Sequence, residues 1–243
     1  MNCLVTAGNT QVWIDKVRCI TNIFSGRTGA QIALELHQQG HEVTLFTSRP
    51  ESLDELRGPG APSLRNFHLH TYQTYDDLQA LMASHIPGNH FEAIIHSAAV
   101  SDYLSAGVYT LTKDNYFDAP TLSFKEANKA LRNVAASKVK SDYDEVWMRF
   151  VKAPKLVDCI RRHWEYRGIL VKFKLEVEIS EKDLERVAEA SRVHSQADLM
   201  VANTLEGMRD WAILGPLNQT YLRIPRAQLA ARVVDALKQL GSR

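Results

Sequence analysis

Short apolar runs alternate along the chain with longer segments whose apolar residues recur three or four positions apart. The runs predict strands at residues 2–6, 41–47, 67–72, 91–96, 146–151, 169–173 and 198–202, and two short strands near 211–214 and 220–223. The helical spacing predicts helices at residues 28–39, 76–84, 154–164, 181–194 and 225–240, and a further helix is expected at 121–134. Strands that alternate with helices are typical of βαβ units. The sequence therefore predicts an α/β fold in which helices flank a mostly parallel sheet.

The regular pattern loosens between residues 105 and 137. We interpret 105–137 as a flap or a projecting arm, either a lid or a dimerisation element. The stretch at 58–62, which is rich in glycine and proline, is interpreted as a loop rather than a domain boundary. A single domain over residues 1–243 is therefore expected.

Composition narrows the functional class. The 243 residues are 45% apolar and 23% charged, which is average for a globular protein. The formal net charge is +1, so a sequence-independent grip on nucleic acid or on an anionic membrane is not expected. The sequence has no signal-peptide pattern at its start and no run of 18 apolar residues, and its three cysteines lack CxxC spacing. We expect a cytoplasmic protein without membrane or nucleic-acid partners, disulfide framework or zinc ribbon.

Small and polar residues gather at the start of the helix expected at 28–39, close in sequence to the first strand. Ligands bind beyond the carboxyl ends of the strands in open α/β sheets. Gly26 and Gly29 would let a ligand approach the backbone, and the helix amides would attract an anion. The alternative is an ordinary turn with Ser25 as helix cap. The pattern is neither GxGxxG nor GxxxxGK[ST], which disfavours a simple dehydrogenase and a P-loop NTPase.

Two further strand ends carry candidate residues. Asp102 follows the strand at 91–96 and is suited to accept hydrogen bonds or to hold Mg²⁺, with a helix or turn cap as the alternative. Lys172 and Lys174 flank Phe173 and are candidates for contacts with phosphate, with an exposed strand edge as the alternative.

These segments belong to a longer series of motifs. In chain order they are Thr6-Ala7-Gly8, Asp15 with Arg18, Asn22 followed by Ser25-Gly26-x-x-Gly29, Ala98-Ala99-Val100-Ser101-Asp102-Tyr103, Lys138-Val139-Lys140, Val151-Lys152-x-Pro154, Phe173-Lys174-Leu175-Glu176 and Val201-Ala202-Asn203. No one motif is specific, but the ordered series closely resembles phosphopantothenoylcysteine synthetase, the phosphopantothenate–cysteine ligase family of coenzyme A biosynthesis. The resemblance extends from residue 2 to about residue 240.

The resemblance implies a Rossmann-like homodimer that catalyses a two-step ligation. CTP or ATP, with Mg²⁺, converts the carboxylate of phosphopantothenate to an acyl-nucleotidylate and releases pyrophosphate. The amine of cysteine then attacks the acyl group, which yields an amide and a nucleoside monophosphate. The sequence begins at the first strand of the synthetase, so we expect a monofunctional form without the flavin-dependent decarboxylase that precedes this domain in many bacteria.

The resemblance also implies roles for particular residues. Asn22 matches the catalytic asparagine, whose amide donates to the acyl oxygen as negative charge develops. Lys138 matches the lysine that neutralises phosphate charge, and without the resemblance it would be interpreted as an exposed loop lysine. No metal ligand is assigned, although Asp102 is the candidate. The residues expected to bind substrate and nucleotide are Gly8, Ser25, Gly26, Gly29, Ala98, Ala99, Asp102, Pro154, Phe173 and Asn203.

The sequence departs from the family pattern in the first loop and before the strand at 198–202. Asn9 replaces the second glycine of Gly-Gly-Thr, and Phe24 replaces the first serine of Ser-Ser-Gly. Members that use CTP carry two lysines where this chain has Ser191 and Ser195. The motif that begins at Phe173 is closer to the eukaryotic branch, which uses ATP. The choice between CTP and ATP therefore stays open.

Two other functions are alternatives. An NAD(P)-dependent Rossmann reductase would need a dinucleotide fingerprint and a Tyr-x-x-x-Lys pair, but Tyr103 is followed four residues later by Gly107. A non-catalytic nucleotide- or metabolite-binding protein on the same fold is suggested by the altered loop and the missing lysines. The presence of Asn22 and Lys138 argues against it.

Overall fold

The computed structural model of the chain describes residues 1–113 and 116–241. The chain divides into two compact units, and each has its own sheet structure. The first unit comprises Met1–Thr10, Ile23–Val100 and Lys155–Arg243, and the second comprises Gln11–Asn22 and Ser101–Pro154. The segment at 105–137, expected as an arm or flap, lies inside the second unit.

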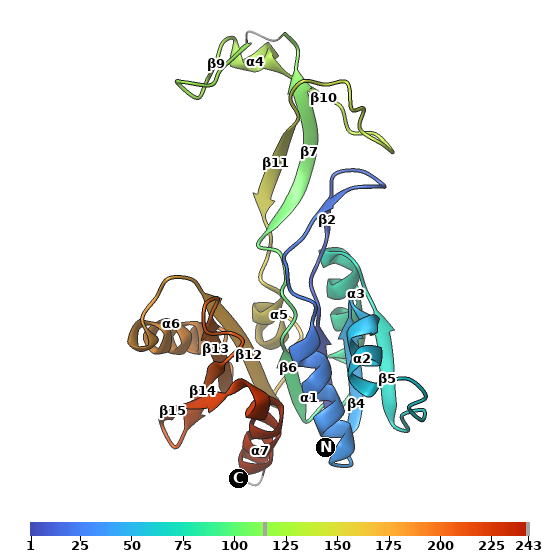
Figure 1. Cartoon of the computed structure of the whole chain (residues 1–243), viewed down its shortest axis with the longest axis vertical. Helices are drawn as coiled ribbons and strands as arrows, with labels where there is room; N and C mark the ends of the chain where they lie inside the picture. The colour runs from blue at the N-terminus through green and yellow to red at the C-terminus, as the bar shows by residue number, and fades with distance from the viewer. Residues whose placement is uncertain (114–115, 242–243) are drawn as a thin grey trace. The chain divides into compact units, whose positions relative to one another are not determined.

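The first unit is built on an eight-stranded sheet (Figure 1). Its parallel strands are β1 (Asn2–Ala7), β4 (Glu42–Thr47), β5 (Phe67–Thr71), β6 (Ala93–His96), β12 (Ile169–Glu176) and β13 (Leu199–Thr204). The antiparallel strands β14 (Trp211–Leu217) and β15 (Thr220–Pro225) extend one edge. The strand order is β15-β14-β13-β12-β6-β1-β4-β5. The predicted mostly parallel, Rossmann-like sheet is confirmed.

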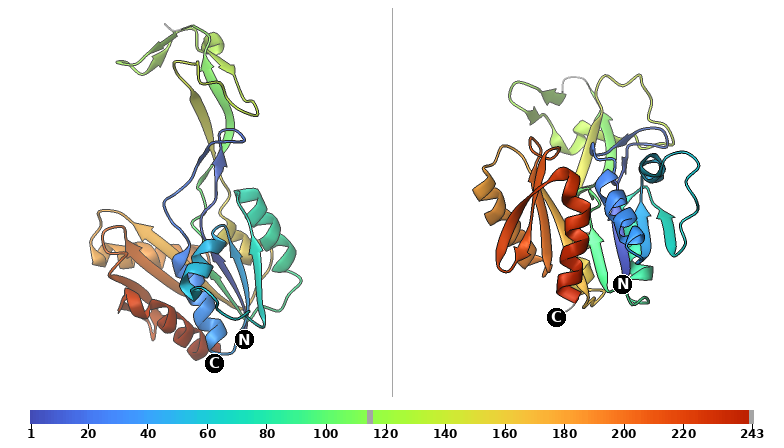
Figure 2. Two further views of the ribbon diagram at one scale, coloured as in Figure 1. Left: turned by 45° about the vertical axis from the view of Figure 1, so that its right-hand side comes forward. Right: turned by 60° about the horizontal axis from the view of Figure 1, so that its bottom comes forward.

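Helices cover both faces of this sheet (Figures 1 and 2). One face carries α1 (Arg27–Gln38), α2 (Pro50–Arg57) and α7 (Leu229–Gly241), the last preceded by a 3-10 turn at Arg226–Gln228. The other face carries α3 (Tyr75–His85), α5 (Leu156–Arg162) and α6 (Glu181–His194). Among the described residues, no helix has the length and apolar character needed to cross a membrane.

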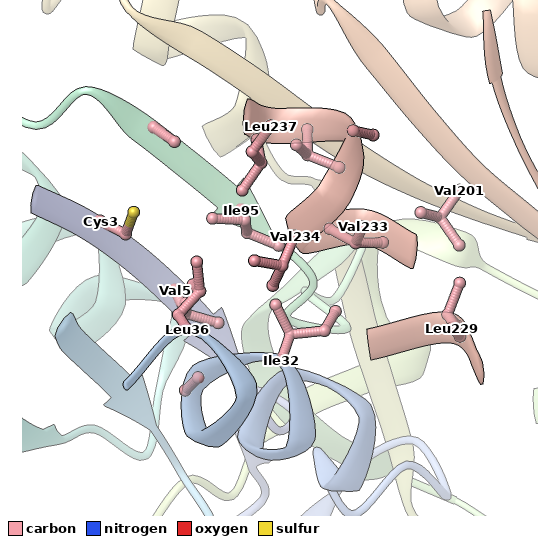
Figure 3. Close-up of a cluster of buried hydrophobic side chains, with 14 of the residues drawn as sticks. Cys3, Val5, Ile32, Leu36, Ile95, Val201, Leu229, Val233, Val234 and Leu237 are labelled. Carbon is pink, nitrogen blue, oxygen red and sulfur yellow. The ribbon is translucent and has the colours of Figure 1, made fainter. Parts of the chain in front are cut away.

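The main core lies between the sheet and the helices α1 and α7 (Figure 3). Ile32 and Leu36 of α1 and Val233 and Leu237 of α7 have no exposed surface. Burial of each such side chain contributes roughly 1.5–3 kcal/mol. Side chains alternate between the two faces of a strand. Val5 of β1 therefore joins this core, whereas Leu4 lies on the opposite face of the sheet.

The second unit is a set of antiparallel strands. Its three-stranded sheet has the order β10-β7-β11, and two short hairpins, β2-β3 and β8-β9, accompany it. Phe117, Phe124 and Trp147 pack together with ring centroids 4.5–5.1 Å apart. The elements are β2 (Val12–Trp13), β3 (Cys19–Ile20), β7 (Tyr103–Leu111), β8 (Phe117–Asp118), β9 (Ser123–Phe124), α4 (Ala127–Ala130), β10 (Leu131–Asn133) and β11 (Trp147–Lys152).

One expected helix was wrong, and one helix was missed. The helix expected at 121–134 is divided into β9, α4 and β10. Leu122 and Glu126 have φ of 50° and 48°, which a continuous helix does not allow, and β10 pairs with β7 instead. The helix α2 was not expected, although Pro50 stands at its first turn, a position that favours proline.

Candidate active site

The candidate site lies in the first unit, at the carboxyl ends of the two central strands β1 and β6. These strands are neighbours, and the strand order reverses between them, so the turns that follow them form the crevice where open α/β sheets bind ligands. A pocket of about 910 Å³ occurs there. Eight of the residues expected from the sequence line it: Gly8, Ser25, Gly26, Gly29, Ala98, Ala99, Phe173 and Asn203.

Gly8 and Gly26 bring two backbone segments unusually close together. Both are in the left-handed region, with φ of 88° and 78°. A Cβ atom on Gly26 would stand 2.3 Å from the amide nitrogen of Gly8 and 2.7 Å from its Cα. Any side chain at position 26 would therefore separate the β1 turn from the start of α1.

The start of α1 leaves backbone donors for a ligand. Its cap residue is Gly26, no side chain caps the helix, and the first turn holds no acidic residue. The alternative in which Ser25 caps this helix was therefore wrong. Instead, the carbonyl oxygen of Ser25 accepts a hydrogen bond of 2.9 Å from Ser52 Oγ. Uncapped amides at the positive end of a helix dipole favour an anionic ligand.

The turn after β6 is fixed to β1 by hydrogen bonds. Ser97 Oγ donates to the carbonyl oxygen of Thr6 at 2.6 Å, and the Ala98 amide donates to Thr6 Oγ1 at 3.2 Å. The Ala99 amide donates to the carbonyl oxygen of Gly8 at 2.8 Å. This part of the pocket wall is thus held by both the backbone and the side chain of Thr6.

A buried histidine lies behind that wall. His96 Nδ1 is 2.9 Å from Thr6 Oγ1, and both residues are buried. Burial and, to a smaller extent, the charge of Lys172 on the adjacent strand lower the pKa of His96 to about 4. The imidazole is therefore neutral at pH 7.

The two lysines that flank Phe173 have different surroundings. Lys174 lines the pocket, and its Nζ is 2.9 Å from Glu176 Oε1. Lys172 does not line it. Its ammonium donates to the carbonyl oxygen of Ser191 at 3.1 Å and to Ser195 Oγ at 2.6 Å.

Ser191 and Ser195 are the positions where the resemblance leads us to expect lysines in members that use CTP. In this chain Ser195 is buried, and its hydroxyl donates to Asp158 Oδ1 at 2.7 Å. Burial lowers the pKa of the Lys172 ammonium. The backbone carbonyl of Ser191 and the hydroxyl of Ser195 therefore both accept hydrogen bonds from Lys172.

Sequence reasoning missed three arginines that line the pocket, Arg27, Arg209 and Arg226. The guanidinium of Arg226 hydrogen-bonds to Thr28 Oγ1 in the first turn of α1, and burial lowers its pKa. A cation at the start of a helical segment opposes the helix dipole. Arg226 directly follows Pro225, and proline is typical of a helix start. This is the sequence signal from which Arg226 could have been considered as a site residue.

The other four expected site residues, Asn22, Asp102, Lys138 and Pro154, belong to the second unit. Within that unit, the segment at 11–22 is joined to the segment that carries Lys138. The Asp15 carboxylate accepts the Val139 amide at 3.0 Å, and the Lys16 amide donates to the carbonyl oxygen of Ser137 at 3.0 Å. Lys138 itself is exposed.

The Asp15 side chain is buried, and both of its carboxylate oxygens accept hydrogen bonds. It accepts the amides of Val17 and Arg18 at 2.9 and 2.8 Å, and Nε and Nη2 of Arg18 at 3.0 and 2.6 Å. The Arg18 guanidinium holds the pKa of the Asp15 carboxyl well below its usual value. The same guanidinium donates to the carbonyl oxygen of Val139 at 2.7 Å. Asp15 and Arg18 together therefore bind both the backbone amide and the backbone carbonyl of Val139.

The structure also bears on metal ligands and on the cysteines. Among the described residues, no three His, Cys, Asp or Glu side chains come together as a metal site. The cysteines Cys3, Cys19 and Cys159 are free, and burial raises the pKa of Cys3 to about 12.

Comparisons with known proteins agree with this geometry. The chain is 27% identical to the coenzyme A biosynthesis bifunctional protein CoaBC of Thermococcus kodakarensis, over 98% of this chain and 51% of that protein. It is 30% identical to the protein of the same name from Escherichia coli (strain K12), over 84% of this chain and 41% of that protein. The chain thus spans about half the length of these relatives.

A solved structure covers the whole fold. The crystal structure of the DNA/pantothenate metabolism flavoprotein from Streptococcus pneumoniae matches with a TM-score of 0.76 and 26% identity, over 99% of both chains. The family model described as the DNA/pantothenate metabolism flavoprotein C-terminal domain matches residues 1–138, more than half of the chain. The chain therefore belongs to the family of the DNA/pantothenate metabolism flavoprotein C-terminal domain.

Proposed function

We propose that this chain is a phosphopantothenate–cysteine ligase of coenzyme A biosynthesis. The observation that carries the proposal is the pocket of the first unit. It lies at the reversal point of the sheet and is lined by eight residues that the resemblance assigns to substrate or nucleotide binding. The names of its bifunctional relatives place them in coenzyme A biosynthesis, which supports the same substrate class here.

The first step activates a carboxylate. A carboxylate oxygen of phosphopantothenate forms a bond to the α-phosphorus of the nucleotide, and the bond from that phosphorus to the β-phosphate oxygen breaks, releasing pyrophosphate. The uncapped amides at the start of α1 are suited to negatively charged phosphate oxygens. We assign to Lys138 the neutralisation of phosphate charge in this step, as the resemblance implies.

The second step forms the amide. The amine nitrogen of cysteine attacks the acyl carbon, the carbon–oxygen bond to the nucleotide breaks, and the nucleoside monophosphate leaves. The attacking nitrogen loses a proton. We assign Asn22 to the acyl oxygen, where a donated hydrogen bond stabilises the charge that develops in the transition state. Asp102 and Pro154 are assigned to substrate and nucleotide contacts.

Magnesium and the nucleotide complete the proposal. Because the described side chains offer no three-ligand cluster, Mg²⁺ would be held chiefly by the nucleotide phosphates, where it would neutralise charge, with Asp102 as the candidate protein ligand. The co-substrate is CTP or ATP, and the assembly is a homodimer. Ser195 is buried against Lys172, and neither serine position carries the lysine that the resemblance associates with CTP, which favours ATP.

A turnover assay tests the function directly. The purified chain is mixed with phosphopantothenate, cysteine, Mg²⁺ and either ATP or CTP, and pyrophosphate and the amide product are measured. We expect product with at least one nucleotide, and only in the presence of all substrates. Nucleotide binding without product would favour a non-catalytic binding protein and would overturn the proposal.

Two variants test the assigned roles. Asn22→Ala should lower amide formation roughly 100- to 1000-fold, the effect of losing one oxyanion donor. Lys138→Gln should slow pyrophosphate release. Lys140→Gln is the matched control, because Lys140 is an exposed lysine two residues away. An unchanged rate in the Asn22 variant would remove Asn22 from the mechanism.

A further inference from the structure

Arg226 is a cation for which the described residues supply no anionic partner. Its guanidinium is partly buried in the wall of the pocket, and its side chain hydrogen-bonds to Thr28 Oγ1. No carboxylate of residues 1–113 or 116–241 forms an ion pair with it. A guanidinium withdrawn from water without a counter-charge is unfavourable, so the site is best satisfied by a negatively charged ligand.

Arg226 lies beside the start of α1, and the pocket that it lines carries further positive charge. Thr28 lies in the first turn of α1, whose amides are uncapped. Arg27, Lys174 and Arg209 line the same pocket. Arg27 pairs with Glu55 at 3.5 Å and Lys174 with Glu176 at 2.9 Å, so their charges are partly balanced. The carboxylate of Glu35 also lines it, but two helical turns further along α1, where Gln39 Nε2 donates to it at 2.6 Å.

The backbone fixes where Arg226 stands. Its amide donates to the carbonyl oxygen of Asp210 at 2.8 Å, and the 3-10 turn that it begins leads directly into α7. The helices α1 and α7 pack against each other in the main core. Arg226 is therefore carried on a rigid element beside the start of α1, rather than on a loop that would have to close.

We propose that Arg226 binds the polyphosphate of the nucleotide, its guanidinium and the first-turn amides of α1 taking different phosphate oxygens. The identity of the polyphosphate rests on the proposed function, whereas the class of ligand, a polyphosphate anion, rests on the pocket. The planar fork of arginine matches two phosphate oxygens at once, so lysine should replace it only in part. The polyphosphate then lies at the Arg226 end of the pocket and away from Glu35.

Calorimetric titration of the full chain with inorganic pyrophosphate, with the nucleoside triphosphate and with the uncharged nucleoside tests this assignment. In Arg226→Gln, the affinity for pyrophosphate and for the triphosphate should fall roughly 10- to 100-fold, the effect of losing a charge-assisted hydrogen bond. The affinity for the nucleoside should not change. Arg226→Lys should recover part of the loss.

Arg223→Gln is the matched control. Arg223 lies three residues away on β15, where it pairs with Glu181 at 3.4 Å and stacks on Trp211, and it does not line the pocket. It should bind pyrophosphate as the wild type does. Equal pyrophosphate affinity in Arg226→Gln and the wild type would overturn the inference.

A second measurement avoids dependence on a variant. Phenylglyoxal modifies accessible arginines, and pyrophosphate should protect Arg226 in the wild-type chain while leaving Arg223 reactive, as read by mass spectrometry. Modification of Arg226 at the same rate with and without pyrophosphate would contradict the assignment. If the chain proves inactive as a ligase but Arg226 is still protected, the proposed function fails and the polyphosphate site stands. If the chain is active as a ligase and Arg226→Gln keeps the wild-type KM for the nucleotide, the proposed function stands and the polyphosphate site at Arg226 fails.

Discussion

The carboxylate of Asp15 accepts the backbone amide of Val139 across 124 residues of sequence, at 3.0 Å. Val139 is the neighbour of Lys138, and Asp15 lies in the segment that ends at Asn22. One buried carboxylate thus joins the two segments of the second unit that carry the proposed catalytic residues. The Arg18 guanidinium completes the contact through the carbonyl oxygen of Val139.

We predict that Asp15→Asn lowers turnover while the chain still folds. Oδ2 accepts the Val139 amide and the Arg18 guanidinium, and Oδ1 accepts the amides of Val17 and Arg18. Asparagine has only one acceptor oxygen and carries its own N–H donors, so one of these two sets of donors loses its acceptor. Misplacement of the lysine segment should reduce kcat roughly 10- to 100-fold. The measurement is kcat for pyrophosphate release, with thermal unfolding as the check on folding.

The exposed Asp142 of the same segment supplies the control for this prediction. Asp142→Asn changes the net charge equally and should leave kcat near the wild-type value. If both variants keep wild-type kcat, Asp15 does not position Lys138.

We predict that Gly26→Ala is more destabilising than Gly40→Ala. Both glycines have a left-handed φ, 78° and 80°, so alanine costs about 1–2 kcal/mol of backbone strain at either position. A Cβ on Gly40 meets nothing within 4 Å, whereas one on Gly26 meets the backbone of Gly8. The resulting overpacking should add roughly 1–3 kcal/mol.

Urea unfolding of the two glycine variants measures this difference in the free energy of unfolding. Gly26→Ala should also weaken pyrophosphate binding, because it displaces the start of α1 from the β1 turn. Equal destabilisation by the two substitutions would show that the close approach to Gly8 carries no energy.

Much of the first unit could be predicted from the sequence because its central strands are buried on both faces. Strands such as β1 and β6 therefore contain short apolar runs, and helices with one buried side, such as α6, show helical spacing. The exposed segment at 121–134 has no such constraint. There, strand pairing and two residues with positive φ decided the structure, and the predicted helix was wrong.

The site could be predicted only where its residues form local motifs. Gly26 and Gly29 are recognisable because a turn and a helix start require glycine. Arg226 is not, because its place in the pocket depends on Thr28, which is 198 residues away in the sequence. The contact of Lys172 with Ser195 has the same character, since it depends on the packing of α6 against the sheet.

We predict that Ser195→Ala destabilises the chain, whereas Ser191→Ala does not. Lys172 uses the hydroxyl of Ser195 but only the backbone carbonyl of Ser191. Loss of the Ser195 hydroxyl leaves a buried ammonium with fewer acceptors and should cost roughly 1–3 kcal/mol. Ser191→Ala keeps the carbonyl and should change the free energy of unfolding by less than about 0.5 kcal/mol. Urea unfolding at pH 7 measures both, and a neutral Ser195→Ala would contradict the proposed support of Lys172.

We predict that His96 makes the chain less stable as the pH falls from about 6.5 to about 4. Burial lowers the pKa of His96 to about 4, whereas a histidine in an unfolded chain has a pKa near 6.5. Between these values the unfolded chain binds a proton that the folded chain does not, so the free energy of unfolding falls as the pH falls. The full difference amounts to about 3 kcal/mol.

The variant His96→Gln isolates this contribution. Glutamine still offers a hydrogen-bonding partner for Thr6 Oγ1, but it does not titrate. Urea unfolding from pH 7 to pH 4 should give a shallower loss of stability for the variant than for the wild type, by roughly the amount assigned to His96. Parallel curves would mean that the imidazole takes up its proton in the folded chain as readily as in the unfolded one. The Thr6–His96 hydrogen bond would then not require a neutral ring, and the wall formed by Ser97 and Ala98 should withstand mild acid.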